Sequence, residues 1–118
     1  MKTHILIIDD EPRWIDFVKN DLSKFEVVVA PDTEMALAEL EVDQFDLVII
    51  SSRRLDALEI IARKYSNKRV VVTTVQPTIQ EAFAVYRLGP RRYFAKSFGH
   101  RDLFERVEEV IPAVAVAG

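Results

Sequence analysis

Residues 5–12 read Ile-Leu-Ile-Ile-Asp-Asp-Glu-Pro, four apolar residues followed by three carboxylates and a proline. A short apolar run rich in β-branched residues is typical of a strand buried on both faces, as in a parallel sheet covered by helices. Similar runs follow at 27–29, 47–50 and 70–72, and a weaker one at 93–95. The stretch therefore predicts the first of five strands, with acidic residues at its carboxyl end.

Segments with helical spacing of apolar residues alternate with these runs, at 12–23, 32–41, 56–65, 78–88 and 101–111. Right-handed crossovers then give an α/β fold, a doubly wound (βα)₅ sheet of five parallel strands, most simply in the order 2-1-3-4-5. We expect residues 1–112 to form this single domain and residues 113–118 to be a tail or the start of a linker.

The residues at the helix starts and on the inward faces can also be predicted. Pro12 suits a first helical turn, and Asp32 and Thr78 are suitable N-caps. In the second helix we expect Met35, Ala36, Leu37 and Leu40 to face the core.

The composition excludes several classes of protein. A chain of 118 residues with 49% hydrophobic and 30% charged residues is typical of one globular domain. The absence of cysteine excludes a disulfide scaffold, a cysteine zinc site and a thiol nucleophile. No apolar run approaches the ~18 residues of a membrane span, so we expect a cytoplasmic protein with no membrane partner.

The charge is distributed unevenly along the chain. Residues 1–50 carry 4 basic and 12 acidic side chains, a net charge of −8, whereas residues 51–118 carry 12 basic and 7 acidic side chains, a net charge of +5. This asymmetry suits charge-steered docking to another protein, although solvated helix faces can produce it too. Because the whole chain is slightly acidic, we do not expect direct nucleic-acid binding by this domain.

Polar residues follow the predicted strands at the edge where such sheets carry their chemistry. They are Asp9, Asp10, Glu11, Ser51, Ser52, Arg53, Arg54, Thr73, Thr74, Lys96 and Ser97. Neither of the glycine-rich phosphate-binding motifs is present, so nucleotide binding by such loops is not expected.

These stretches resemble the receiver domain of two-component response regulators over essentially the whole chain. Residues 5–12 resemble the family's first strand and acidic pair, and residues 45–50 resemble the lead-in to its phospho-accepting aspartate. Residues 70–74 and 93–98 resemble the strands that end in its hydroxyl and its lysine. The resemblance implies a flavodoxin-like receiver fold, phosphorelay signal transduction through protein partners, and no enzyme activity.

The resemblance also assigns site residues. In the family, an acidic pair and the acceptor aspartate hold Mg²⁺, while the lysine and the hydroxyl bind the phosphoryl group. Asp9 and Asp10 match the acidic pair, Thr74 the hydroxyl, Tyr93 the switch aromatic and Lys96 the lysine.

The acceptor position itself holds Ser51, and the segment after it is shorter than expected for a receiver. A serine without an adjacent base is a poor nucleophile and cannot form the mixed anhydride of an aspartyl phosphate. The sequence therefore predicts a pseudo-receiver that acts as an interaction module without aspartyl phosphorylation. We expect no cofactor and weak or no Mg²⁺ binding at Asp9 and Asp10.

Two arginines next to Ser51 suggest what replaces the metal. Arg53 or Arg54 can reach the acidic pair from one side and Lys96 from the other. At ~4 Å and an effective dielectric constant of 20, each such contact contributes about 4 kcal/mol before desolvation. We expect an internal salt-bridge cluster, the alternative being two arginines that point into solvent.

The fourth helix carries more apolar residues than one buried stripe requires. We predict an interface made by Phe83, Val85, Arg87, Leu88, Arg91 and Arg92. In the receiver family the surface of helix 4, strand 5 and helix 5 serves partner docking and dimerisation, which here suggests a homodimer. The alternative is a helix that is simply more buried than most.

Two other functions stay open at this point. One is a receiver-like domain controlled by a ligand or by Ser/Thr phosphorylation at the same pocket. The other is a small flavodoxin-like enzyme or cofactor binder, which the missing phosphate loops disfavour.

Overall fold

Five parallel strands in the order β2-β1-β3-β4-β5 form the centre of the molecule, which confirms the predicted topology. The structure is a computed structural model that describes residues 2–65, 67–90 and 92–111. The strands are β1 (His4–Ile8), β2 (Glu26–Ala30), β3 (Leu47–Ser51), β4 (Val70–Thr74) and β5 (Arg92–Ala95). The helices are α1 (Pro12–Asp21), α2 (Thr33–Val42), the 3₁₀ turn η1 (Ser52–Arg54), α3 (Leu55–Lys64), α4 (Ile79–Arg87) and α5 (Asp102–Val110).

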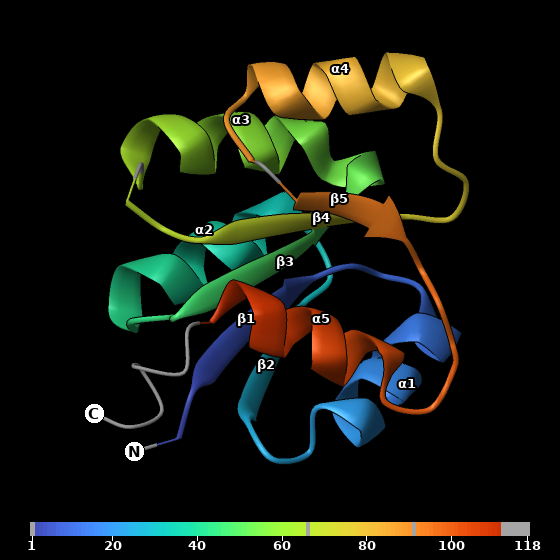
Figure 1. The fold of residues 1–118 in the computed structure, drawn as a ribbon. Helices are drawn as coiled ribbons and strands as arrows, with labels where there is room; N and C mark the ends of the chain where they lie inside the picture. The colour runs from blue at the N-terminus through green and yellow to red at the C-terminus, as the bar shows by residue number, and fades with distance from the viewer. Residues whose placement is uncertain (1, 66, 91, 112–118) are drawn as a thin grey trace.

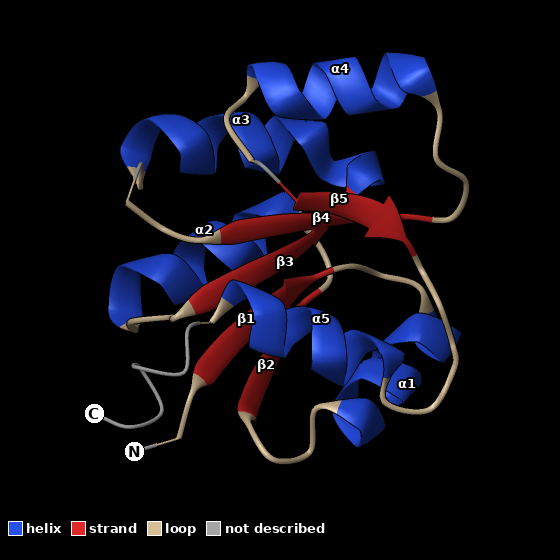
Figure 2. Ribbon diagram, in the orientation of Figure 1, coloured by secondary structure: helices blue, strands red, loops and turns tan. Residues whose placement is uncertain are grey.

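Helices cover both faces of the sheet (Figures 1 and 2). Helices α1 and α5 lie on one face, while α2, α3 and α4 lie on the other. Alternate residues of β1 serve the two layers: Ile5 and Ile7 pack beneath α1 and α5, and Leu6 and Ile8 pack beneath the other three helices. This two-sided burial explains why the strand runs are apolar without alternation.

The predicted helix starts are present. Pro12 is the first residue of α1. The side chain of Asp32 accepts a hydrogen bond from the Met35 N–H at 2.8 Å, and that of Thr78 accepts one from the Glu81 N–H at 3.1 Å. Both caps satisfy backbone donors that a helix start leaves free.

The inward face predicted for α2 is partly wrong. Ala36 and Leu40 are buried and Leu37 packs against the same core, but half of the Met35 surface is exposed. Ala36 and Leu40 are four residues apart and define the buried stripe, and Met35 lies about 100° around the helix from Ala36.

Two further predictions concern a membrane span and the tail of the chain. No helix in the described part of the chain combines the length and apolar character needed to cross a membrane. The predicted tail at 113–118 lies outside the described residues.

Candidate functional site

The register of the sheet brings the predicted site residues to one edge. Ile8 pairs with Ile50, so Asp9 and Ser51 leave neighbouring strands at the same level. Ser51 pairs with Thr73 on β4. On the far side, the Lys96 N–H donates to the Thr74 carbonyl at 2.7 Å. Carboxylate, hydroxyl and ammonium groups from four strands therefore meet at this edge.

Asp9 and Lys96 form a buried ion pair at the centre of the site. Nζ of Lys96 lies 2.9 Å from Oδ2 of Asp9 and 3.7 Å from Oε2 of Glu11, and only 3% and 2% of the Lys96 and Asp9 side chains are exposed. Oδ1 of Asp9 accepts the Glu11 N–H at 3.1 Å. Within the described residues Oδ2 has no hydrogen bond of ordinary geometry. The charge of the nearby Lys96 ammonium is therefore the main interaction that offsets the cost of burying this oxygen.

Asp10 faces the two arginines that follow β3. Its carboxylate oxygens lie 3.1 Å from Nη2 of Arg54 and 3.4 Å from Nη2 of Arg53. The short helix η1 produces this approach, because Oγ of Ser51 caps it by accepting the Arg53 N–H at 3.2 Å. Since these groups are partly exposed, solvent screening keeps each contact weaker than the pair of Asp9 and Lys96.

The residues present do not fit Mg²⁺ as they stand. Mg²⁺ requires several oxygen ligands in nearly octahedral geometry. Both Asp9 and Asp10 already face cationic side chains, and the neighbouring strand end offers a serine in place of a third carboxylate. No group of three or more histidine, cysteine, aspartate or glutamate side chains in the described part of the chain is placed to hold a metal ion.

A second set of polar groups gathers around Glu81, a residue that the sequence reasoning missed. The Tyr93 hydroxyl donates to Oε1 of Glu81 at 2.5 Å and accepts the Thr78 N–H at 3.3 Å. Burial raises the pKa of Glu81, but the hydroxyls of Thr74, Tyr93 and Ser52 together outweigh it and hold that pKa below its usual value. Burial and the bond to Glu81 raise the pKa of the Tyr93 phenol.

A sequence signal for Glu81 does exist. Thr78 and Glu81 have the Ser/Thr-x-x-Glu spacing of a capping box, in which the glutamate reaches back toward the N-cap N–H. That spacing fixes Glu81 in the first turn of α4, but it does not tell which hydroxyls surround the carboxylate. The crossover from β4 to α4 and the position of β5 determine that.

The prediction that Val85 belongs to an interface is wrong, because Val85 is fully buried. Leu88 is partly buried against the core beneath α2, α3 and α4, and its place in an interface stays a prediction. The apolar residues that α4 leaves exposed are Ile79, Phe83 and Tyr86, with 76%, 66% and 45% of their surfaces accessible. They lie four and three positions apart and form one stripe, which we call the α4 stripe.

Two of the predicted basic residues lie at the end of α4 and at the start of β5. Arg87 is exposed at the end of α4. Nη1 of Arg92 lies 3.7 Å from Oε2 of Glu109 on α5. Arg91 lies outside the described residues.

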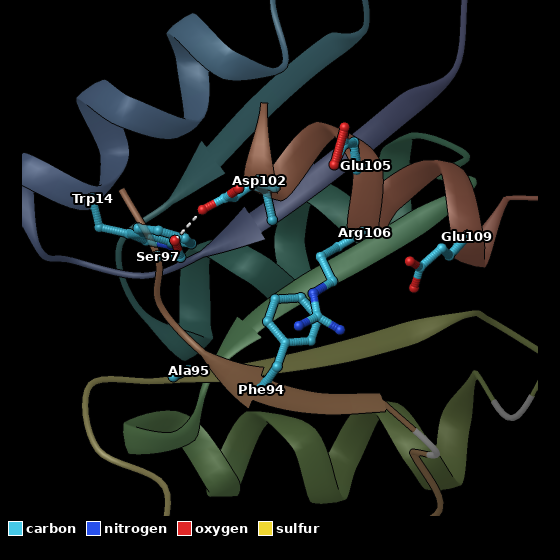
Figure 3. A pocket seen from close by; sticks show the side chains of 9 residues that line it. Trp14, Phe94, Ala95, Ser97, Asp102, Glu105, Arg106 and Glu109 are labelled. Carbon is cyan, nitrogen blue, oxygen red and sulfur yellow. Dashed lines mark hydrogen bonds between the residues drawn. The ribbon is translucent and has the colours of Figure 1, made fainter. Parts of the chain in front are cut away.

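A groove of about 430 Å³ lies between β5 and α5 (Figure 3). Arg106 is stacked 5.0 Å from the centre of the Phe94 ring, and Ser97 donates a hydrogen bond to Asp102. Trp14 lines the groove, and the centre of its ring lies 5.5 Å from Nζ of Lys96. The single tryptophan therefore lies between the groove and the buried ion pair.

Comparison with known proteins agrees with this fold. Residues 5–108 match the family described as "Response regulator receiver domain". The chain belongs to the response regulator receiver family.

Relatives and solved structures extend the comparison. The heme response regulator HssR of Staphylococcus saprophyticus is 26% identical over 115 residues, covering 92% of this chain and 51% of the relative. The alkaline phosphatase synthesis transcriptional regulatory protein PhoP of Bacillus subtilis is 24% identical over 124 residues, covering 99% of this chain and 52% of the relative. The chain thus spans about half the length of these curated relatives.

Two solved structures share the fold closely. A response regulator from Thermotoga maritima superposes with a TM-score of 0.85 at 23% identity, covering 94% of this chain and 98% of the other. A CheY-like receiver domain protein from Methanospirillum hungatei superposes with a TM-score of 0.86 at 22% identity, covering all of both chains.

Proposed function

We propose that this receiver domain transmits signals through protein contacts without being phosphorylated on an aspartate. One observation carries the proposal: Ser51, and no carboxylate, ends β3 beside the buried pair of Asp9 and Lys96. Its Oγ accepts the Arg53 N–H and so caps η1. A serine hydroxyl needs an adjacent base to become a good nucleophile, and the hydrogen bond that Oγ of Ser51 accepts comes from a backbone N–H.

The ion pairs around Asp9 and Asp10 support the same proposal. A receiver that accepts a phosphoryl group needs a divalent cation to offset the incoming negative charge. Here Lys96, Arg53 and Arg54 already neutralise the acidic residues. The site is therefore electrostatically balanced without metal and without phosphate.

Incubation with acetyl phosphate and Mg²⁺ tests the proposal directly. We expect the intact mass of the wild type to stay unchanged. A stoichiometric, hydroxylamine-labile gain of one phosphoryl group would overturn the proposal.

A restoring substitution gives a second test. Ser51→Asp alone is expected to remain largely unphosphorylated, because Arg53 and Arg54 still hold Asp10. The triple variant Ser51→Asp, Arg53→Ala, Arg54→Ala frees that carboxylate and is expected to gain more phosphate than Ser51→Asp. Equal labelling of the two variants would show that the arginines do not restrict the site.

We further propose that the α4 stripe is the contact surface and that a second copy of this chain covers it. Ile79, Phe83 and Tyr86 form a continuous apolar strip, which suits burial against a partner. Arg87 follows Tyr86 at the end of α4, and Glu81 lies in the first turn of the same helix. A helix surface that carries both signs of charge can complement a second copy of itself across a two-fold axis.

A further inference from the structure

We infer that the Glu81 carboxylate is an internal anion that couples the Tyr93 hydroxyl of β5 to helix α4. It accepts a hydrogen bond from that hydroxyl in the first turn of the helix. It thereby fixes the first turn of α4, and with it the α4 stripe. The inference deepens the proposed function, on which it rests for the role of that stripe.

The start of α4 departs from the ordinary capping geometry. In an ordinary capping box the glutamate accepts a hydrogen bond directly from the N-cap N–H. Here the Tyr93 hydroxyl stands between the two groups: it accepts the Thr78 N–H at 3.3 Å and donates to Oε1 of Glu81 at 2.5 Å. The side chain of Thr78 completes the box by accepting the Glu81 N–H at 3.1 Å. The cap of α4 is therefore built partly from β5.

The carboxylate is also influenced by groups of the candidate site. The hydroxyls of Thr74 at the end of β4 and Ser52 in η1 act with that of Tyr93 to lower the pKa of Glu81. The Thr74 hydroxyl itself donates to the Gln76 carbonyl at 3.3 Å. The hydrogen bond from Tyr93 is therefore the direct link between Glu81 and the sheet.

Tyr93 also connects Glu81 to the exposed surface of α4. The Tyr93 ring meets the Tyr86 ring edge-on, with 6.4 Å between their centres. Tyr86 belongs to the α4 stripe, and Glu81 lies on the same helix between Ile79 and Phe83. A change at the carboxylate consequently alters both the orientation of Tyr93 and the start of the helix that carries the stripe.

The experiment compares Glu81→Gln with Glu34→Gln. Glu34 occupies the first turn of α2, so its substitution removes a comparable charge near a helix start without touching the hydroxyls. The readouts are the titration of the Tyr93 phenol by ¹³C NMR and amide hydrogen exchange of residues 79–82. We expect Glu81→Gln to move the titration midpoint of Tyr93 toward that of ordinary tyrosine. We also expect amide exchange in the first turn of α4 to accelerate about tenfold. Loss of a hydrogen bond to a charged group favours local opening of the helix start by about that factor.

The variant Tyr93→Phe tests the same hydrogen bond by removing its donor. In Tyr93→Phe the titration midpoint of the Glu81 carboxyl is expected to rise toward its ordinary value, because one of the hydroxyls that lower its pKa is gone. If Tyr93 titration and α4 exchange in Glu81→Gln match those of the wild type, or change equally in Glu34→Gln, the inference is overturned. Phosphorylation of the wild type by acetyl phosphate would instead overturn the proposed function, so the two failures are distinguishable.

Discussion

Nζ of Lys96 lies 2.9 Å from Oδ2 of Asp9, and both side chains are almost completely buried. With an acidic residue in place of Ser51, three carboxylates would meet here, and each pair about 5 Å apart would repel by about 3 kcal/mol at an effective dielectric constant of 20. Serine removes one of these charges. The carboxylates of Asp9, Asp10 and Glu11 then face three cationic side chains at this edge of the sheet.

Lys96→Met is expected to destabilise the domain by about 3–5 kcal/mol, because it leaves the Asp9 carboxylate buried without its cation. Urea denaturation measures the change. In a Lys96→Met, Asp9→Asn double variant much of the loss is expected to be recovered. Lys64→Met is the control, since its exposed pair with Glu41 contributes less than about 1 kcal/mol. A Lys96→Met variant as stable as the control would contradict the importance of the pair.

Millimolar Mg²⁺ is expected to leave the thermal midpoint and the Trp14 fluorescence of the wild type unchanged. Specific binding at 100 times the dissociation constant would stabilise the fold by about 2.7 kcal/mol, which a melting curve detects easily. Trp14 lies 5.5 Å from Nζ of Lys96, so displacement of that ammonium would alter its emission. Saturable stabilisation by Mg²⁺, absent in Asp10→Asn, would show that the carboxylates remain available.

The double variant Ile79→Ser, Phe83→Ser is expected to weaken self-association while changing folding stability little, because both side chains are exposed. Sedimentation velocity over a range of concentrations and salt measures the association. Val85→Ser on the same helix is the contrast: it is expected to lower stability by at least about 2 kcal/mol, since it cuts into the core. If the wild type stays monomeric at high concentration, a second copy of the chain does not cover the α4 stripe.

Thr33→Val probes a contact between the starts of α2 and α3. The Thr33 hydroxyl donates to Oδ2 of Asp56 at 2.8 Å and, as the largest influence, holds the pKa of Asp56 below its ordinary value of 3.8. A lowered pKa in the folded state stabilises the fold above the unfolded pKa, and the contribution is lost as the pH falls through the folded pKa. Because Asp56 is exposed, the loss at pH 7 is about 0.5 kcal/mol.

Stability curves from pH 7 down to pH 2 test this expectation. The difference between Thr33→Val and the wild type should shrink below about pH 4. In an Asp56→Asn background the same substitution should have little effect at any pH. A constant difference across the range would assign the effect to packing of Thr33.

The sequence alone determined the layers and the strand order of this protein. Apolar runs such as 5–8 and 47–50 have no polar side, so their strands are buried on both faces, and alternation with helices requires parallel crossovers. The acidic residues at the end of the first run and Ser51 at the end of the third follow from the same pattern. These features are local or periodic, and a single chain displays them directly.

Tertiary structure alone decided which polar groups meet and which face of α4 is exposed. Lys96 and Asp9 are 87 positions apart in the sequence, and only the order of the strands brings them to 2.9 Å. Val85 and Phe83 are both apolar residues of one helix, so composition could not tell which would be buried. The rotation of α4 on the sheet determines that, and the cap shared by Thr78, Tyr93 and Glu81 anchors the start of the helix.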